Sequence, residues 1–203
     1  MSSKTTDRRQ GRAAGKSGGR LPAAAATSPD QIRNVAVVGH SGVGKTTLVE
    51  HLLARTGALG RAGSVADGST VSDADPVEVS QQRSVFLSIC PTSYRGCVLN
   101  LLDTPGFADF VGELRAGLRA ADAALFVVSA ADDLDQSTLA LWEEYAALGT
   151  PLALVINRLD APRADLAHTV AGCPQALGGV GGNAVLPLYL PPPDGQPPHP
   201  LHS

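Results

Sequence analysis

The stretch IRNVAVVGHSGVGKT, Ile32 to Thr46, decides the fold that this sequence predicts. Its β-branched run stops at Gly39, as a buried parallel strand does, and the loop that follows fits G-x-x-x-x-G-K-[ST] at every fixed position. Leu48, Leu52 and Leu53 then recur on one helical face. A strand, a glycine-rich loop and a helix in this order predict a phosphate-binding loop in an α/β protein.

Each residue type in this loop suits a bound phosphate chain. Its glycines allow the backbone to curl, so that successive N–H groups point at phosphate oxygens, and the helix N-terminus adds partial positive charge. Lys45 is expected to stabilise phosphate charge between the β- and γ-phosphates, and the Thr46 hydroxyl to ligate Mg²⁺. His40 is expected to act as a spacer rather than a catalyst. The residues predicted to bind nucleotide here are Gly39, His40, Ser41, Gly42, Val43, Gly44, Lys45, Thr46 and Thr47.

A second motif, NRLD at 157–160, follows the apolar run PLALVIN. The Asp160 carboxylate can accept two hydrogen bonds from the ring N–H and the exocyclic amine of guanine, which adenine lacks on that edge. Asn157 is expected to tie this loop to the phosphate loop, and the stem of Arg158 to lie across the base. Alone the motif is a surface turn, but after a strand and a phosphate loop it predicts guanine rather than adenine.

A third motif lies in NLLDTPGF, residues 100–107. Asp103, at the end of an apolar run, can hold a water molecule on Mg²⁺, and the Gly106 N–H can donate to a γ-phosphate oxygen. Without the other two motifs, an Asp-initiated turn after a strand would be the simpler interpretation. Together the three motifs predict a site for GTP or GDP with Mg²⁺.

Composition narrows the function classes. The chain has 203 residues, 43% of them hydrophobic, and a net charge of -3, which gives no general attraction to nucleic acid or membrane. We expect no sequence-specific nucleic-acid binding, no membrane span and no export signal, hence a cytoplasmic protein. Cys90, Cys97 and Cys173 lack metal-ligand spacing and are expected to be reduced thiols. Oligomeric state does not follow from the sequence.

Three regions are expected along the chain. Residues 1–31 form a basic, disordered tail, in which GRAAGKS at 11–17 imitates a phosphate loop but lacks a preceding strand. Residues 32–162 form a nucleotide-binding core, and residues 163–203 form a partial subdomain with a Pro-rich coil. Within the core, residues 58–83 are expected to be a long loop without helical or strand periodicity.

The alternation of apolar runs and helical stripes predicts a mostly parallel sheet with helices on both faces. The expected elements are a hairpin of 84–90 and 97–103, helices around 111–121 and 134–148, strands at 123–130 and 151–157, a short helix in 163–177 that Pro174 would interrupt, an edge strand at 183–190, and coil from 191.

With these residues in view, the sequence resembles the G domain of the elongation factor G family, and most of all the elongation factor G-like proteins of actinobacteria. The stretches that carry the resemblance are GHSGVGKTTL, DTPGFADFVGELRAGLRAADAALFVVSA and NRLD, within a region from about residue 32 to 191. The resemblance implies a P-loop NTPase G domain and a Mg²⁺-dependent GTP switch whose partner is the ribosome.

Three departures limit what the resemblance implies. The family has His after Asp-Thr-Pro-Gly, where it helps position the attacking water; this chain has Phe107. The family has a Thr that contacts Mg²⁺ and the γ-phosphate where this chain has Phe86, and Ser84 and Ser88 nearby would be out of phase in a strand. The sequence also ends soon after the start of the G domain insertion, before the sheet's last strand, so that 151–157 is expected to be an edge strand.

These departures predict GTP and GDP binding with slow or negligible hydrolysis, because the charge-stabilising groups are present and the water-positioning groups are replaced. Two alternatives stay open at this point. One is a ribosome-associated regulatory protein that binds GTP without hydrolysing it. The other is an inert, truncated gene product.

Overall fold

The computed structural model describes residues 26–106, 111–146, 148–177, 189–190 and 199–200. A five-stranded sheet has the order β2-β3-β1-β4-β5, with β2 antiparallel to β3 and every other pair parallel. The elements are η1 (Pro29–Gln31), β1 (Ile32–Val38), α1 (Lys45–Arg55), α2 (Pro76–Gln81), β2 (Ser88–Tyr94), β3 (Cys97–Asp103), α3 (Val111–Ala120), β4 (Ala123–Ser129), α4 (Gln136–Ala146), β5 (Leu152–Asn157), α5 (Leu166–Leu177), β6 (Tyr189–Leu190) and β7 (His199–Pro200).

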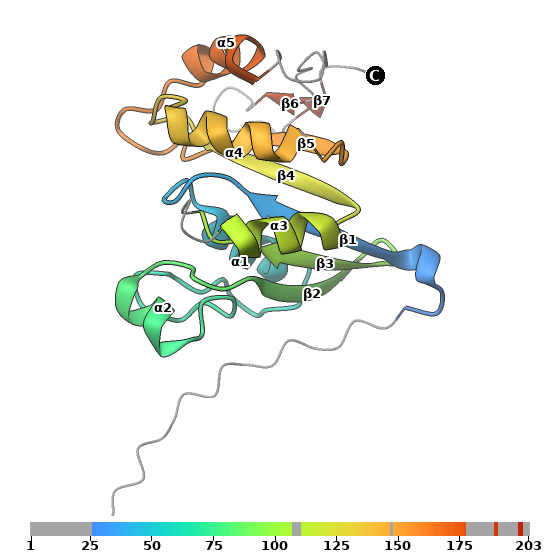
Figure 1. The fold of residues 1–203 in the computed structure, drawn as a ribbon. Helices are drawn as coiled ribbons and strands as arrows, with labels where there is room; N and C mark the ends of the chain where they lie inside the picture. The colour runs from blue at the N-terminus through green and yellow to red at the C-terminus, as the bar shows by residue number, and fades with distance from the viewer. Residues whose placement is uncertain (1–25, 107–110, 147, 178–188, 191–198, 201–203) are drawn as a thin grey trace, which may run out of the picture.

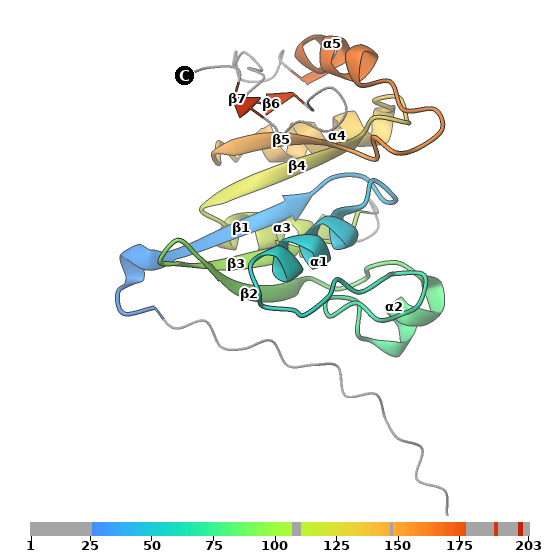
Figure 2. The ribbon, with the colours of Figure 1, turned by 180° about the vertical axis from the view of Figure 1, so that it is seen from behind.

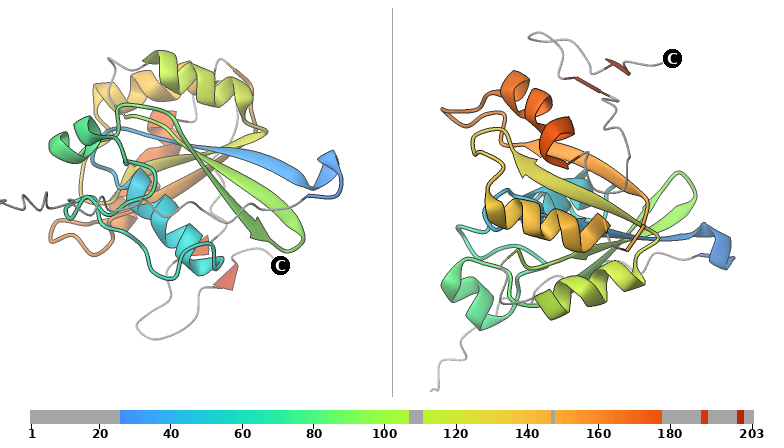
Figure 3. Two further views of the ribbon diagram at one scale, coloured as in Figure 1. Left: turned by 90° about the horizontal axis from the view of Figure 1, so that it is seen from below. Right: turned by 45° about the horizontal axis from the view of Figure 1, so that its top comes forward.

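The helices cover both faces of this sheet (Figures 1 and 2). Alternate strand residues point to opposite sides, so Val38 and Phe126 pack with α3 and α4 on one face, whereas Val37 and Val127 pack with α1 on the other. The left view of Figure 3 shows α3 and α1 on opposite sides of the strands. The predicted α/β class, a P-loop G domain with a mostly parallel sheet, is confirmed.

The predicted loop at 58–83 is wrong in part, because α2 lies within it. Asp75 caps this helix: its side chain accepts a hydrogen bond from the Val77 N–H, Pro76 occupies the first turn, and Glu78 closes a capping box. The signal was present in the sequence as Asp-Pro-x-Glu, but the six-residue helix is too short to show an apolar stripe.

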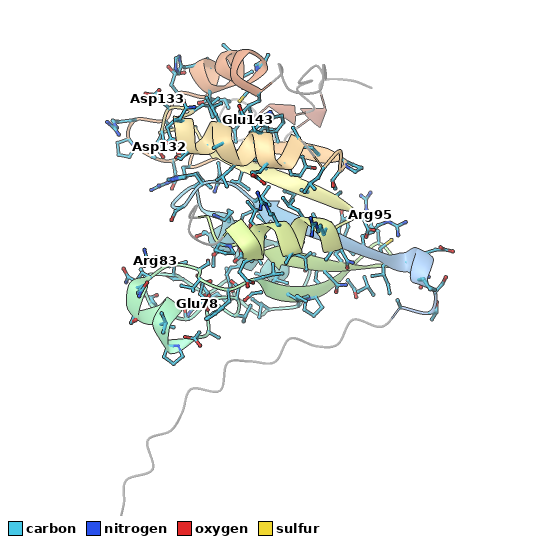
Figure 4. The ribbon with its side chains drawn as sticks, in the orientation of Figure 1. Glu78, Arg83, Arg95, Asp132, Asp133 and Glu143 are labelled. Atoms are coloured by element: carbon cyan, nitrogen blue, oxygen red, sulfur yellow. The ribbon has the colours of Figure 1, made fainter. Side chains whose placement is uncertain are left out.

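Two buried carboxylates hold residues 59–87, which we call the pinned segment, against the rest of the protein. Glu50 of α1 accepts hydrogen bonds from the Gly63 N–H (2.8 Å) and the Val71 N–H (2.6 Å). Glu78 accepts from the N–H groups of Val85 (2.9 Å) and Phe86 (3.0 Å). Figure 4 places Glu78 on α2, at the end of the sheet opposite Arg95 in the β2–β3 turn. Side-chain acceptors therefore satisfy backbone groups that have no sheet partner.

Other element boundaries also differ from the prediction. Strand β2 begins at Ser88 instead of residue 84 and continues through Pro91 to Tyr94, on the outer side of β3 where a proline costs no ladder hydrogen bond. Helix α5 continues past Pro174 to Leu177. Helix α4 spans 136–146 and leaves out both predicted end residues, Leu134 and Leu148.

The predicted disordered tail is wrong at its last residues, because η1 is a short 3-10 helix. The predicted C-terminal coil is wrong where β7 pairs with β6. Residues 1–25, most of the predicted strand at 183–190 and the coil at 191–198 lie outside the described residues. Within the described residues, β5 has one strand neighbour, as expected for an edge. None of the described helices has the length and apolarity needed to cross a membrane.

The thiols are consistent with an inert role. Cys90 and Cys173 are buried, Cys97 is half-buried, and all three are free. Burial raises the pKa of Cys90 to about 12, which disfavours the reactive thiolate. Among the described residues, no group of three or more His, Cys, Asp or Glu side chains is placed to hold a metal ion.

Candidate functional site

The phosphate loop, Gly39–Thr46, joins the end of β1 to the start of α1. Gly44 caps the helix with a left-handed φ of 90° and offers no side-chain hydrogen bond. A Cβ at Gly44 would be strained by this φ and would lie 2.6 Å from the Asn157 amide nitrogen, which would have to move. The first-turn N–H groups of α1 are therefore left to bind an external acceptor, which the helix dipole makes favourable for an anion.

Lys45 lies buried across this loop. Its Nζ donates hydrogen bonds to the carbonyl oxygens of Gly39 (2.9 Å) and His40 (3.0 Å). Burial lowers the Lys45 pKa to about 8, and the nearby charges of Asp103 and Asp73 oppose that shift. The ammonium group is thus held in place by backbone carbonyls and partly desolvated, which strengthens its interaction with an arriving phosphate.

The turn after β3 packs directly on the phosphate loop. The Ser41 N–H donates to the Gly106 carbonyl oxygen (3.1 Å), and the Thr104 hydroxyl donates to the Val37 carbonyl oxygen (2.8 Å). A Cβ at Gly106 would collide with Lys45 Nζ and with the Ser41 backbone. Glycine is therefore required by the close approach of the two loops rather than by its own φ.

Asp103 and Thr46 meet between these two loops. The Thr46 hydroxyl donates to Asp103 Oδ2 at 2.8 Å, and both side chains are buried. Burial raises the Asp103 pKa to about 6, although the Lys45 charge and the Thr46 hydrogen bond lower it. The other carboxylate oxygen, Oδ1, is buried without a hydrogen-bond partner. A buried acceptor of this kind is suited to a cation or a cation-bound water.

The loop after β5 reaches the phosphate loop from the far side. Asn157 Nδ2 donates to the Val43 carbonyl oxygen (2.9 Å), and Arg158 Nη1 donates to the Gly42 carbonyl oxygen (2.9 Å). Arg158 adopts a left-handed φ of 58°. Asp160 is exposed at the turn that follows. Two segments more than a hundred residues apart in sequence are thus joined beyond the carboxyl ends of the parallel strands.

The remaining predicted site residues differ in how far they are buried. His40 and Ser41 are half-buried, Val43 is in the core, and Thr47 is exposed on the first turn of α1. The guanidinium group of Arg158 is hydrogen-bonded to the phosphate loop, and the expected placement of its stem across a base stays a prediction. Phe107 lies outside the described residues, so the prediction that it takes no part in catalysis stays a prediction.

The structure adds two site residues that sequence reasoning missed or misplaced. The Ser84 hydroxyl lies 3.1 Å from the Thr46 hydroxyl, although a strand at 84–90 would have turned it out of phase. The error follows from the strand boundary: residues 84–87 are not a strand, so two-residue periodicity does not apply. Asp73, in the pinned segment, is buried near Lys45 and Asp103, and burial raises its pKa. Phe86, at the position of the family Thr, is exposed.

Residues 30–184 match the family model described as the elongation factor Tu GTP binding domain. This chain belongs to that family. The match includes the phosphate loop, the turn after β3 and the loop after β5, so the three motifs lie within one GTP-binding domain.

The relatives agree with this assignment. The chain is 50% identical to an elongation factor G-like protein of Mycobacterium tuberculosis over 87% of its own length and 24% of that protein. It is 34% identical to elongation factor G 2 of Streptomyces coelicolor, over 72% of this chain and 21% of that protein. It is also 43% identical to peptide chain release factor 3 of Nitrosomonas eutropha, over 63% of this chain and 25% of that protein. The chain thus spans about a quarter of the length of these curated relatives.

A solved structure from Thermus thermophilus is similar in three dimensions. It superposes with a TM-score of 0.74 over 81% of this chain and 24% of that chain, at 41% sequence identity. The resemblance to elongation factor G-like proteins that the motifs indicated is therefore confirmed.

Proposed function

We propose that this chain is the GTP-binding module of an elongation factor G-like translational GTPase, which binds GTP and GDP with Mg²⁺ and hydrolyses GTP weakly. The observation that carries the proposal is the hydrogen bond from Asn157 to the Val43 carbonyl oxygen, because it brings a base-reading loop onto a phosphate loop. Lys45, the amides of the loop and Thr46 would bind the phosphates. Asp160 would select guanine.

Magnesium fits the residues present. Thr46 offers a hydroxyl oxygen and Asp103 a buried carboxylate oxygen without a partner, and both are ligand types that Mg²⁺ prefers. Bound there, the ion would neutralise charge on the β- and γ-phosphates. Thr46 would contact the ion and Asp103 would hold one of its water molecules.

Binding is tested by titrating the purified chain with a fluorescent GDP analogue in the presence of Mg²⁺. Lys45→Ala should weaken binding by roughly 100-fold or more, because it removes a desolvated cation that pairs with phosphate. Lys16→Ala is a matched control, since Lys16 belongs to the look-alike stretch GRAAGKS and should have no effect. Equal affinities for the wild type and Lys45→Ala would contradict the proposal.

The weak hydrolysis proposed here depends on Phe107. A phenyl ring neither donates nor accepts a hydrogen bond to an attacking water, so single-turnover hydrolysis of GTP should be slow. Phe107→His should raise that rate while leaving GDP affinity unchanged. Fast hydrolysis by the wild type that Lys45→Ala abolishes would show that the missing imidazole is unimportant.

The relatives are named as elongation factors and a peptide chain release factor, which supports a role in translation. The ribosome as partner and the cytoplasm as location are part of this proposal. The replacement at Phe107 favours a second candidate, a non-hydrolysing ribosome-associated regulator. Co-sedimentation with ribosomes in a non-hydrolysable GTP analogue, without turnover, would favour it. No sedimentation with either GDP or the analogue would contradict ribosome association in both candidates.

A further inference from the structure

Charged side chains are buried unevenly beside the phosphate loop. Among the described residues one buried lysine, Lys45, accompanies four buried carboxylates: Glu50, Asp73, Glu78 and Asp103. A buried carboxylate needs hydrogen-bond donors or a cation to offset the loss of hydration. A buried carboxylate oxygen that has no hydrogen-bond donor in the fold is therefore a candidate ligand for a cation.

Two of the four are satisfied by backbone donors. Both oxygens of Glu50 accept an N–H hydrogen bond, at 2.8 and 2.6 Å, and both oxygens of Glu78 accept N–H groups as well. These carboxylates hold the pinned segment in place. Their charge is used structurally, so they require no ion.

Asp73 and Asp103 differ from this pair. Asp73 Oδ2 and Asp103 Oδ1 are buried and have no hydrogen-bond partner, and Asp73 is only 5% exposed. Native proteins pair almost all buried polar atoms, so two orphaned carboxylate oxygens in one site indicate a ligand.

The two aspartates belong to the same site. Ser88 pairs with Asp103 across β2 and β3, and the Ser88 hydroxyl donates to the Ser72 carbonyl oxygen (2.7 Å), which brings Asp73 to the end of β3. Thr46 hydrogen-bonds to Asp103 and lies 3.1 Å from Ser84, the residue on the other side of α2. A hydroxyl oxygen of Ser84 and a carboxylate oxygen of Asp103 thus contact Thr46, and Asp73 is close enough for its charge to act on Asp103 and Lys45.

One ammonium group does not neutralise two carboxylates, so this cluster keeps an excess negative charge. Oxygen-only ligands with one or two carboxylates are typical of magnesium and manganese sites. We propose that Asp73, together with Thr46 and Asp103, holds a divalent cation before any nucleotide binds. The inference rests on the proposed nucleotide site, because it adds Asp73 to residues already assigned there.

The test is to titrate the nucleotide-free chain with Mn²⁺ and measure the free ion by electron paramagnetic resonance. The wild type should bind one Mn²⁺, and Asp73→Asn should weaken that binding roughly 10- to 100-fold. Asp67→Asn is the matched control, since Asp67 is an exposed aspartate of the same pinned segment and should leave the affinity unchanged. Circular dichroism and the melting temperature check that both variants fold.

The absence of Mn²⁺ binding to the nucleotide-free wild type would overturn the inference. This result does not depend on whether Asp73→Asn folds. Equal Mn²⁺ affinity in a folded Asp73→Asn would also overturn the inference, since Thr46 and Asp103 would then suffice. Fluorescent GDP binding, measured in parallel, separates the two proposals. Normal GDP binding without a preformed Mn²⁺ site contradicts this inference only, whereas loss of GDP binding contradicts the proposed function.

Discussion

The phosphate loop and the pinned segment face the same site but are built differently. The phosphate loop is held by hydrogen bonds to its own carbonyl groups, from Lys45, Asn157 and Arg158. The pinned segment has no strand partner over residues 59–87 and is held by carboxylates, above all Glu50 and Glu78. The first arrangement presents donors to an anion, whereas the second adds negative charge beside it.

This difference indicates which part of the site the sequence motifs describe. The motifs describe the phosphate loop, the turn after β3 and the loop after β5, where the backbone has little conformational freedom. In the pinned segment the family Thr is replaced by an exposed Phe86, and Ser84 and Asp73 occupy the site instead. The pinned segment therefore contains one of this chain's departures from its family, at Phe86, beside two polar side chains, Ser84 and Asp73, that the motifs do not specify.

The largest effect on stability is expected at Glu50. Glu50→Ala leaves the partly buried Gly63 and Val71 N–H groups without their acceptor. A fully buried unpaired donor costs about 1–3 kcal/mol, so the free energy of unfolding should fall by about 3 kcal/mol. Urea denaturation measures it. Glu143→Ala, on the exposed side of α4, is the control and should change little. A loss below 1 kcal/mol at Glu50 would mean that other contacts hold the pinned segment.

The next effect concerns pH. The Asp103 pKa is raised to about 6 in the folded chain, so the folded state favours the protonated form. The stabilisation is complete below the unfolded pKa of about 3.9 and is lost as pH rises through 6. In EDTA, unfolding free energy should thus decrease by about 2 kcal/mol between pH 4.5 and 7, since one unit of pKa shift is worth about 1.4 kcal/mol.

Asp103→Asn should flatten this dependence over the same pH range, because the amide does not titrate. Thermal denaturation of both proteins across the range measures the difference. Parallel curves for the wild type and the variant would show that Asp103 does not cause the pH dependence.

A smaller effect on GDP affinity is expected where the loop after β5 contacts the phosphate loop. Asn157→Ala removes the hydrogen bond to the Val43 carbonyl oxygen, which is worth about 1.4 kcal/mol or less. GDP affinity should therefore fall by up to about tenfold. Isothermal calorimetry measures it, and an unchanged affinity would separate the base-reading loop from the phosphate loop in function.

The smallest effect belongs to the cap of α2. Asp75→Ala removes the side-chain acceptor for the Val77 N–H and should cost about 1 kcal/mol, confined to the pinned segment. Hydrogen exchange should quicken at α2 and stay unchanged in β1. Equal changes in both would mean that the pinned segment and the phosphate loop unfold as one unit.

The fold could be predicted where sequence periodicity and motif coincide. β1, β4 and β5 carry long apolar runs, and α1 follows a loop that permits few backbone conformations, so these elements lie where the sequence indicates. The phosphate loop was predictable for the same reason. Its residues act mainly through their backbone, and the glycine pattern encodes that backbone.

The pinned segment could not be predicted in this way. Its order depends on Glu50 and Glu78, which reach backbone groups up to 21 residues away in sequence, and no local pattern marks such partners. The sequence indicates α2 only through its capping box, because a helix of six residues shows no apolar stripe. Residues 84–87 have the apolar and β-branched composition of a strand but lie outside β2, so alternation along a strand does not give the orientation of Ser84.

The most direct test of the account is competition for fluorescent GDP bound to the chain, with GTP and ATP as competitors. GTP should displace the probe at a concentration roughly 1,000-fold below that of ATP or lower, because Asp160 can pair only with guanine. Asp160→Asn should narrow that gap, since its amide replaces one acceptor with a donor. Displacement by ATP and GTP at equal concentrations would contradict the assignment of this site to guanine nucleotides.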